Sequence, residues 1–495
     1  MAAVWTAEGD SRGGGRERDE RGWVGRALAS LLVVVLIGAG VATWQLDLLD
    51  RLSSDEKDPP AGPAAVEPPS GLELPAVTPP PAVDTPLTPP GEIDAALVQA
   101  AMAPYLADPA LGGHVVGAVA DLTAGQPVVP VGDDSAAMPA SVTKVLTTTA
   151  ALAALGPETR FTTRVLAGGK GRIVLVGGGD PFLASEPTPS AYPERADVET
   201  LAAQTAAALR AQGRTRVQLG YDDSLFAEPS FNPAWPAHYL PEHVVAPITA
   251  LWVDEGRPAE GSGRVDDPSL YAAQTFAAAL VAQGIAVDGA PTHGVAAGGR
   301  ELASVESAEL REIVTHVLEA SDNEGAEVLS HQVGKAVTGT AGFTDGAAAV
   351  VQTLQGLGVP PAGITLYDGS GLSRENRITP TALIAVLRAA FDPAHPELNA
   401  VTTALPVAGF TGSLTNRFDE PFPESRGLVR AKTGTLTNVS SLAGIAVDQD
   451  GHAMLFVLMA DQIDKPDETK AQKALDAAAG ALGACHCGAM SNSTG

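Results

Sequence analysis

The sequence predicts a fold of the α/β (α+β) class, in which an antiparallel sheet flanked by helices is interrupted by a smaller inserted α+β domain. Near the start, residues 92–106 have a helical pattern, and residues 114–132 read as two strands joined by a turn. Near the end, residues 440–461 read as a second strand pair, and a helical pattern follows at 468–483. Between residues 168 and 300 the texture changes to short strands, proline-rich loops and two alanine-rich helices, which indicates an insertion.

Local signals set the limits of several elements. Residues 138–155 carry apolar side chains at helical spacing, and Gly156-Pro157 follows, where a helix cannot continue. In the insertion, a helix is expected to begin at Asp267-Pro268, because Asp is a favoured N-cap and Pro suits the first helical position. The second strand pair is expected to turn at Asp448–Gly451.

The chain has 495 residues, of which 45% are hydrophobic, enough for more than one folded unit. Its formal net charge is −27, which argues against nucleic acid as a partner, since a phosphate-binding face needs clustered Lys and Arg. The expected organisation is a cytoplasmic tail (1–26), a transmembrane helix or signal anchor (27–46), a proline-rich linker (47–91), a core in two parts (92–167 and 301–483), an inserted domain (168–300) and a disordered tail (484–495).

Residues 27–46 form an uncharged apolar stretch with the length of a membrane-spanning helix. Arginines precede it and few basic residues follow closely, so the positive-inside rule puts the N-terminus in the cytoplasm and the rest of the chain outside. A cleaved signal peptide is the alternative, although no clean Ala-x-Ala site follows. Both interpretations export the domain, either bound to the cell membrane or secreted to the wall.

Two further segments have simple compositional interpretations. Residues 53–91 hold twelve of the 39 prolines and are expected to form an extended stalk. The two cysteines, Cys485 and Cys487, lie in the last residues of the chain. Two thiolates and one imidazole fall short of a four-ligand zinc site, so we expect no metal, no disulfide framework and a loose polar tail.

A nucleophile candidate begins the 138–155 helix. Ser141 and Lys144 are three residues apart, so on a helix they share a face. A neutral lysine could take the hydroxyl proton of the serine, and lysine is neutral near pH 7 only where burial or a second cation lowers its pKa. The alternative is that Ser141 merely caps the helix.

Two further motifs agree with an acylating site. Ser321-Asp322-Asn323 heads a helical pattern, and Lys432-Thr433-Gly434 lies on a strand-like run. They supply a relay hydroxyl, an amide, and a second cation that could bind a substrate carboxylate and lower the pKa of Lys144. Gly434 would let a substrate backbone lie close to the strand. Caps at Ser321 and Asn323, and a strand ending in a turn, are the alternative interpretations.

The three motifs in this order are the signature of the penicillin-recognising serine enzymes. Over about residues 95 to 480 the chain resembles the D-alanyl-D-alanine carboxypeptidase/endopeptidase family, the class C low-molecular-mass penicillin-binding proteins. Stretches such as "YDGSGLSRENRITP", "LPVAGFTGSLTNRF" and "VRAKTGTLTNVSSLAG" carry the resemblance beyond the three motifs. It implies a β-lactamase/transpeptidase-like core with an insertion between the first two motifs, and no cofactor.

The resemblance also implies roles for the motif residues. Ser141 would be the acylated nucleophile, Lys144 its base, Ser321 a proton relay, and Asn323 a ligand for the substrate carbonyl. Lys432, Thr433 and Thr435 would bind the terminal carboxylate beside Gly434, and the backbone N–H groups of Ser141 and Thr435 would form the oxyanion hole. The implied substrates are peptidoglycan stem peptides, and the implied inhibitors are β-lactams.

Other functions remain to be weighed. A β-lactamase shares the acylation step, and a non-catalytic wall-binding scaffold could keep the same fold. The sequence contains neither a Gly-x-Ser-x-Gly elbow nor a His-Glu-x-x-His motif, which argues against an α/β-hydrolase and a zinc peptidase.

Overall fold

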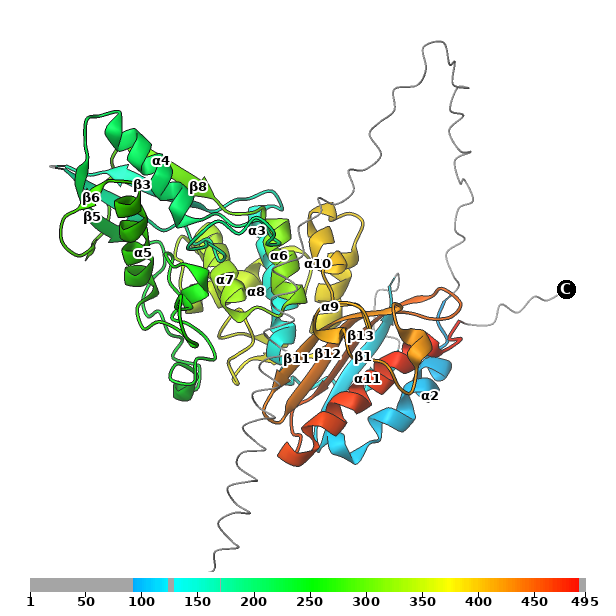
Figure 1. The fold of residues 1–495 in the computed structure, drawn as a ribbon. Helices are drawn as coiled ribbons and strands as arrows, with labels where there is room; N and C mark the ends of the chain where they lie inside the picture. Colours follow the sequence, from blue (N-terminus) through cyan, green and yellow to red (C-terminus); the bar gives the residue numbers. More distant parts are fainter. Residues whose placement is uncertain (1–91, 123–128, 170, 489–495) are drawn as a thin grey trace, which may run out of the picture. The chain divides into compact units, whose positions relative to one another are not determined.

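A computed structural model describes residues 92–122, 129–169 and 171–488. At its centre is a five-stranded sheet in the order β11-β12-β13-β1-β2, and every neighbouring pair in it is antiparallel (Figure 1). The predicted antiparallel core sheet is therefore confirmed. Its strands are β1 (Val115–Asp121), β2 (Val129–Val131), β11 (Val429–Leu436), β12 (Val439–Val447) and β13 (Ala453–Ala460).

Alternate side chains along these strands face opposite sides of the sheet and join two separate apolar layers. On one face, Leu442, Phe456 and their neighbours pack against the adjacent helices α2 (Ala95–Leu106) and α11 (Glu468–Ala484). On the other face, Ala443, Val457 and their neighbours join the larger helical core. The sheet is thus covered by helices on both faces, and the predicted helices at 92–106 and 468–483 are confirmed.

The second layer is built around α3 (Thr143–Leu155), a helix in which ten residues are buried. Its alanines and threonines take little space, which lets several helices approach it closely. Gly156 ends it with a φ of 87°, a conformation that favours glycine. The surrounding helices are α6 (Leu310–Glu319), α7 (Asn323–Thr338), α8 (Phe343–Gly356), α9 (Pro380–Phe391) and α10 (Asn399–Thr403).

The inserted region has its own mixed sheet, in the order β6-β5-β4-β3-β8 with β7 beside β5. Two helices pack on it and share its apolar core, and the second begins at Pro268 with Asp267 as its N-cap, as predicted. Its elements are β3 (Thr162–Ala167), β4 (Arg172–Val176), α4 (Val198–Arg210), β5 (Arg216–Asp222), α5 (Pro268–Ala282), β6 (Ala286–Val287), β7 (Thr292–His293) and β8 (Glu301–Glu306).

The predicted limits of the insertion, 168 and 300, are wrong by about one strand at each end. Strands β3 and β8 pair with each other inside the inserted sheet and so do not belong to the core. The chain leaves and returns at Phe161 and Ser307, where the Ser307 N–H donates to the Phe161 carbonyl at 2.9 Å. Strand composition alone does not say which sheet a strand will join, so the sequence could not place these limits.

Part of the insertion packs directly on the core helices. Residues 226–252 share an apolar cluster with Val328 of α7 and Phe343 of α8. In this cluster the Trp235 ring meets Phe343 edge-on, and its indole N–H donates to Asp368 at 2.8 Å. The insertion is therefore tied to the core by packing and by hydrogen bonds.

The end of the domain differs from the expected loose tail. Cys485 and Cys487 form a disulfide, and Cys487 is buried. The Cys487 N–H donates to Asp448 at 3.0 Å, and the Cys487 carbonyl accepts from the Asp94 N–H at 2.7 Å. The expectations of an unpaired tail and of disorder from residue 484 are thus wrong for residues 484–488, because the turn after β12 and the start of α2 both hold this segment.

The predicted membrane helix at 27–46 and the linker at 47–91 lie outside the described residues, as does the tail from 489. Among the helices of the described ranges, none has the length and apolar character needed to cross a bilayer.

Candidate active site

Ser141 lies in a short 3-10 turn, Ala140–Val142, that leads into α3. The N-cap positions of the turn and of α3 are Pro139 and Val142, so the helix-capping explanation for Ser141 is wrong. Ala140 has a φ of 48°, a left-handed conformation that is unusual for a residue with a side chain and that typically occurs at functional sites. The backbone of the turn is therefore strained at Ala140, the residue directly before Ser141.

Lys144 is buried and faces three oxygen atoms. Its Nζ lies 3.0 Å from Ser141 Oγ, 2.7 Å from Asn323 Oδ1 and 2.7 Å from the Ser370 carbonyl. Burial lowers the pKa of Lys144 to about 8, against the raising effect of nearby carboxylates. A substantial fraction of this lysine is thus neutral in mildly alkaline solution, and its hydrogen-bond distance to Ser141 is that of a base and its nucleophile.

The second motif forms the turn that enters α7. Ser321 has a φ of 59°, and Asp322, whose carboxylate accepts from the Gly325 N–H at 2.7 Å, is the N-cap. Neither Ser321 nor Asn323 is the cap, which leaves both side chains for the site. Asn323 reaches Lys144, and Ser321 reaches Lys432.

The third motif lies on β11, whose strand character is confirmed. Lys432 is buried, and its Nζ donates to Ser321 Oγ at 2.8 Å and to the Thr433 carbonyl at 3.0 Å. Burial lowers the pKa of Lys432 well below its ordinary value, and the charges of Lys144 and Arg417 act in the same direction. The sequence interpretation assigned the fall in the Lys144 pKa partly to Lys432, but burial is the dominant cause for both lysines.

Packing alone requires a glycine at position 434, and the approach of a substrate backbone to it stays a prediction. A Cβ at this position would lie 2.1 Å from Ser441 Oγ and 2.4 Å from the Pro139 carbonyl. The missing side chain lets β11 approach β12 and the turn that carries Ser141. Thr435, one residue further, is paired with Ser440 and exposed.

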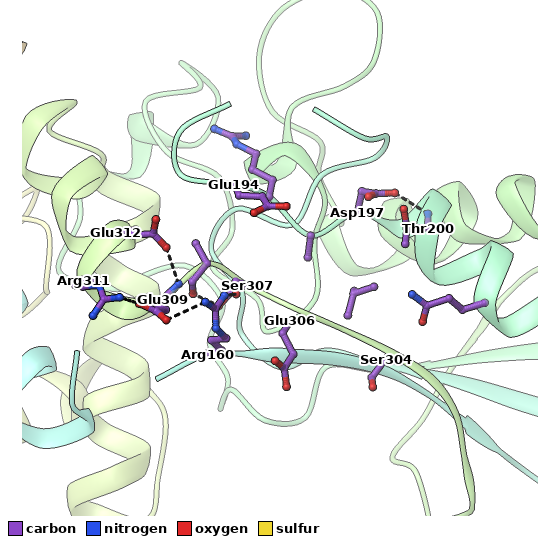
Figure 2. A pocket seen from close by; sticks show the side chains of 15 residues that line it. Arg160, Glu194, Asp197, Thr200, Ser304, Glu306, Ser307, Glu309, Arg311 and Glu312 are labelled. Carbon is purple, nitrogen blue, oxygen red and sulfur yellow. Dashed lines mark hydrogen bonds and ion pairs between the residues drawn. The ribbon is translucent and has the colours of Figure 1, made fainter. Parts of the chain in front are cut away.

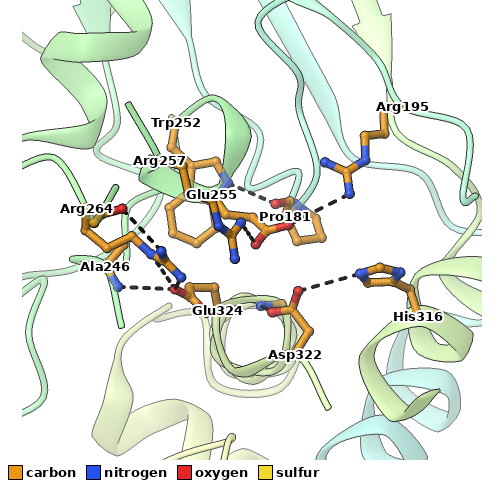
Figure 3. A network of polar contacts seen from close by, with 12 residues as sticks. Pro181, Arg195, Ala246, Trp252, Glu255, Arg257, Arg264, His316, Asp322 and Glu324 are labelled. Atoms are coloured by element: carbon orange, nitrogen blue, oxygen red, sulfur yellow. Dashed lines mark hydrogen bonds and ion pairs between the residues drawn. The ribbon is translucent and has the colours of Figure 1, made fainter. Parts of the chain in front are cut away.

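A charged network borders the second motif. Asp322, Glu324 and Glu255 bring their carboxylates close together, and the Arg264 guanidinium donates to Glu324 at 2.6 Å (Figure 3). Arg257 pairs with Glu255 in the same way. Since arginines already neutralise Glu255 and Glu324, this group does not have the free carboxylates that a cation site needs.

A cavity of about 440 Å³ opens beside this network. Its walls include Ser321 and Asn323 of the second motif together with Arg195, Arg257 and Arg264 of the insertion. Burial raises the pKa of Asp322, which lines the same cavity, to about 7. The insertion therefore borders the site directly.

A second polar cavity, of about 590 Å³, lies between β8 and the first turns of α4 and α6 (Figure 2). Two of its arginines, Arg160 and Arg311, pair with the same carboxylate, Glu309, and the Arg160 contact measures 3.0 Å. The walls of this cavity contain none of the predicted site residues.

Sequence reasoning missed several residues that the structure brings to the site. Glu327 and the Ser370 carbonyl lie beside Lys144, and Ser413 Oγ lies 2.8 Å from Thr433 Oγ1. Ser370 and Ser413 fall within "YDGSGLSRENRITP" and "LPVAGFTGSLTNRF", two stretches that already stood out in the sequence. The glycine and serine residues of these two loops were the signal that the sequence offered.

The structure thus brings Ser141, Lys144 and Asn323 into one cluster and Lys432, Ser321 and Thr433 into a second cluster beside it. A model of the D-Ala-D-Ala carboxypeptidase 3 (S13) family matches residues 98–259 and 256–482. Carboxypeptidase Rv3627c of Mycobacterium tuberculosis is 36% identical over 417 residues, covering 82% of this chain and 87% of that protein. A D-alanyl-D-alanine carboxypeptidase of Actinomadura sp. is 30% identical over 440 residues, covering 71% of this chain and 79% of that protein.

Solved structures show the same fold. Penicillin-binding protein 4 (dacB) from Haemophilus influenzae superposes with a TM-score of 0.62 at 20% identity, covering 78% of this chain and 98% of that one. The same protein complexed with a β-lactam gives a TM-score of 0.58 at 22% identity, covering 76% of this chain and 98% of that one. The chain belongs to the D-Ala-D-Ala carboxypeptidase 3 (S13) family and is a peptidase, so the family resemblance seen in its motifs is confirmed.

Proposed function

We propose that the chain is a serine-type D-Ala-D-Ala carboxypeptidase/endopeptidase that cleaves peptidoglycan stem peptides through an acyl-enzyme on Ser141 and is inhibited by β-lactams. The observation that carries this proposal is the contact of Lys144 Nζ with both Ser141 Oγ and Asn323 Oδ1. It joins a nucleophile, a base of lowered pKa and an amide from two distant segments. The names of the relatives and the β-lactam complex of the structural neighbour support the same substrate and inhibitor classes.

Substrate binding would use hydrogen-bond donors of the second and third motifs. A lysine can only donate when charged, so Asn323 turns Oδ1 to Lys144 and leaves its NH₂ to donate to a substrate carbonyl. In this proposal Lys432, with the hydroxyls of Thr433 and Thr435, binds the terminal carboxylate. A carboxylate there would also favour the charged form of a lysine whose pKa burial lowers.

Acylation then needs two proton transfers, one as the tetrahedral intermediate forms and one as it collapses. Ser141 Oγ attacks the carbonyl carbon of the penultimate D-Ala, while its proton passes to the neutral Lys144 amine. The backbone N–H groups of Ser141 and Thr435 would stabilise the oxyanion of the tetrahedral intermediate. Collapse of the intermediate breaks the C–N bond, and the leaving amine takes a proton through Ser321, whose hydroxyl contacts Lys432. Water hydrolyses the ester and restores Ser141.

We further propose that this enzyme acts outside the cytoplasm, held at the membrane by residues 27–46 or released to the wall after cleavage. The uncharged stretch and the arginines before it support this location. Cell fractionation, with N-terminal sequencing of the mature protein, tests it. Recovery in the cytoplasm with an intact N-terminus would contradict it.

The chemical proposal is tested by incubation with a labelled penicillin and mapping of the modified peptide. We expect the label on the peptide that contains Ser141, no label on Ser141→Ala, and release of D-Ala from a stem peptide by the unmodified enzyme only. An acyl-enzyme that decays within about a second would instead indicate a β-lactamase. Label elsewhere, or hydrolysis that survives Ser141→Ala, would overturn the assignment.

A further inference from the structure

The loop between β9 (Ile364–Thr365) and β10 (Arg377–Ile378) supplies one of the three partners of Lys144. It brings the Ser370 carbonyl to 2.7 Å from Lys144 Nζ. Gly371 follows with a φ of 88°, and a Cβ there would lie 1.9 Å from the Ala140 carbonyl. The loop is therefore pressed against the turn that carries Ser141, closer than any residue with a side chain would allow.

The chemistry of the three partners constrains the direction of the Lys144 lone pair. A neutral amine has two hydrogens and one lone pair. The Ser370 carbonyl can only accept a hydrogen bond, and Asn323 presents its carbonyl oxygen. If these two oxygens take the two hydrogens, the lone pair is left for the third partner, Ser141, whose hydroxyl can donate. The position of Ser370 thus decides whether Lys144 is aligned as a base.

Glu327 holds that position from α7. This carboxylate is buried and accepts from the Ser370 N–H at 2.7 Å and from the Gly369 N–H at 3.1 Å. Burial, followed by the charge of Asp368, raises the pKa of Glu327 to about 8. Burying this carboxyl group destabilises the fold, and the interaction that the structure shows in compensation is its hydrogen bonding to two amides of this loop.

We propose that Glu327 is a positioning residue that fixes the Gly369–Ser370 backbone so that the Ser370 carbonyl directs the Lys144 lone pair at Ser141. The inference rests on the proposed role of Lys144 as the base. Two further contacts hold the same loop. Thr147 Oγ1 donates to the Gly369 carbonyl at 2.6 Å, and Asp368 accepts from the Gly371 N–H at 3.0 Å.

The first test is the pH dependence of acylation by a fluorescent penicillin in Glu327→Gln, with rates normalised to the titrated number of active sites. In the glutamine variant an NH₂ group replaces one of the two oxygens that face the Gly369 N–H, so two donors oppose each other and the Ser370 carbonyl should withdraw. Loss of this acceptor removes a partner of the charged amine and so lowers the pKa of Lys144. We expect the acid limb of the profile to move to lower pH while the plateau rate falls at least about tenfold.

These two effects oppose each other, which makes the result specific. If Glu327 only affected how much neutral Lys144 is present, the variant would be faster than the wild type on the acid side. If Glu327 were merely structural, the normalised plateau would be unchanged. A lower plateau with an unmoved limb, or an unchanged plateau, overturns the inference.

Asp448→Asn is the matched control. Asp448 is also buried and also accepts from backbone amides of a turn, those of Asp450 at 2.9 Å and His452 at 2.8 Å, at the other end of β12. Its variant loses the same kind of interaction and should keep the wild-type profile after normalisation. A profile that shifts equally in both variants would overturn the inference.

A second pair of variants tests the loop without any change of charge. Thr147→Val removes the hydroxyl that holds the Gly369 carbonyl, whereas Thr149→Val removes a buried hydroxyl that bonds only to its own helix, at the Val145 carbonyl. We expect Thr147→Val to lower the plateau about threefold or more and Thr149→Val to leave it unchanged. Equal rates in the two variants would contradict the inference even if Glu327→Gln failed to fold.

The same data separate this inference from the proposed function. If the wild type does not label at Ser141, the proposed function fails. If it labels at Ser141 and Glu327→Gln acylates at the wild-type plateau, only the role of Glu327 fails.

Discussion

The two buried lysines of the site lie in opposite electrostatic surroundings. Burial lowers the pKa of both, but carboxylates such as Asp322 and Asp368 partly restore that of Lys144, which stays at about 8. The charges that act on Lys432 are those of Lys144 and Arg417, and these lower its pKa further. One lysine is thus surrounded by acids and the other by cations.

In the proposed mechanism this difference matches two separate tasks, proton transfer for Lys144 and carboxylate binding for Lys432. Acids adjust Lys144 so that it can lose and regain a proton near neutral pH, as a base must. The cations around Lys432 leave a place where an anion from outside the protein is favoured, as a carboxylate-binding group requires. Variants of each lysine would show whether the two divide the work in this way.

Replacing Lys144 should have the largest effect. Lys144→Met removes the base and keeps an unbranched chain of similar length, so acylation by penicillin should fall about 10³-fold. The loss should be the same for a penicillin whose carboxylate is esterified, because Lys144 acts on Ser141 and not on the carboxylate. Stopped-flow acylation rates with both compounds provide the measurement, and a loss confined to the free carboxylate would contradict the division.

Replacing Lys432 should discriminate between the same two compounds. Lys432→Gln removes a charged hydrogen bond to the ligand carboxylate, which corresponds to a loss of about 10- to 100-fold with free penicillin. The esterified compound should lose much less in the same stopped-flow assay. Equal losses with both compounds would mean that Lys432 acts on the chemistry and not on the carboxylate.

Five residues of the candidate site could be predicted from the sequence, because they lie in short motifs with fixed local spacing. They are Ser141, Lys144, Ser321, Asn323 and Lys432. The strands and helices that carry them were also predictable from apolar periodicity.

The supporting carboxylate was not predictable. Glu327 lies among apolar residues of α7, and nothing local shows that its side chain will meet the amides of Gly369 and Ser370, more than forty residues further along the chain. The predictions of the insertion limits and of a loose tail were wrong for the same reason. Strand pairing and the contact of Cys487 with Asp448 are decided between segments that are distant in sequence.

The pH dependence of the wild type should report Lys144. The base is active when neutral, so below its pKa of about 8 the acylation rate should rise about tenfold per pH unit and then level off. Pre-steady-state rates across this range, with an esterified penicillin to avoid the titration of Lys432, would show it. A rate that falls as the pH rises toward 8 would contradict the assignment of the base.

The smallest expected effect comes from one of the acids near Lys144. Asp322→Asn can still cap α7, but it removes a charge that raises the pKa of Lys144. Because the pKa of Asp322 is itself raised to about 7, the effect appears above that pH: the acid limb should move to lower pH there, and the rate near pH 7.5 should rise about twofold. Thermal unfolding would verify that the cap is kept, and a limb that moves to higher pH would refute the sign.

The contact between Phe161 and Ser307 has a consequence for how this architecture can change over time. Because the chain departs and returns at hydrogen-bonded neighbours, a single genetic join could remove or enlarge everything between them without rerouting the core. Such a deletion would nevertheless uncover Val328 and Phe343, and it would take the Trp235 indole away from Asp368, in the loop that faces Lys144. The chain path would therefore allow the insertion to be lost, but its contacts with the core would not. Its growth or loss in descendants must be accompanied by compensating changes in the residues beside Ser141.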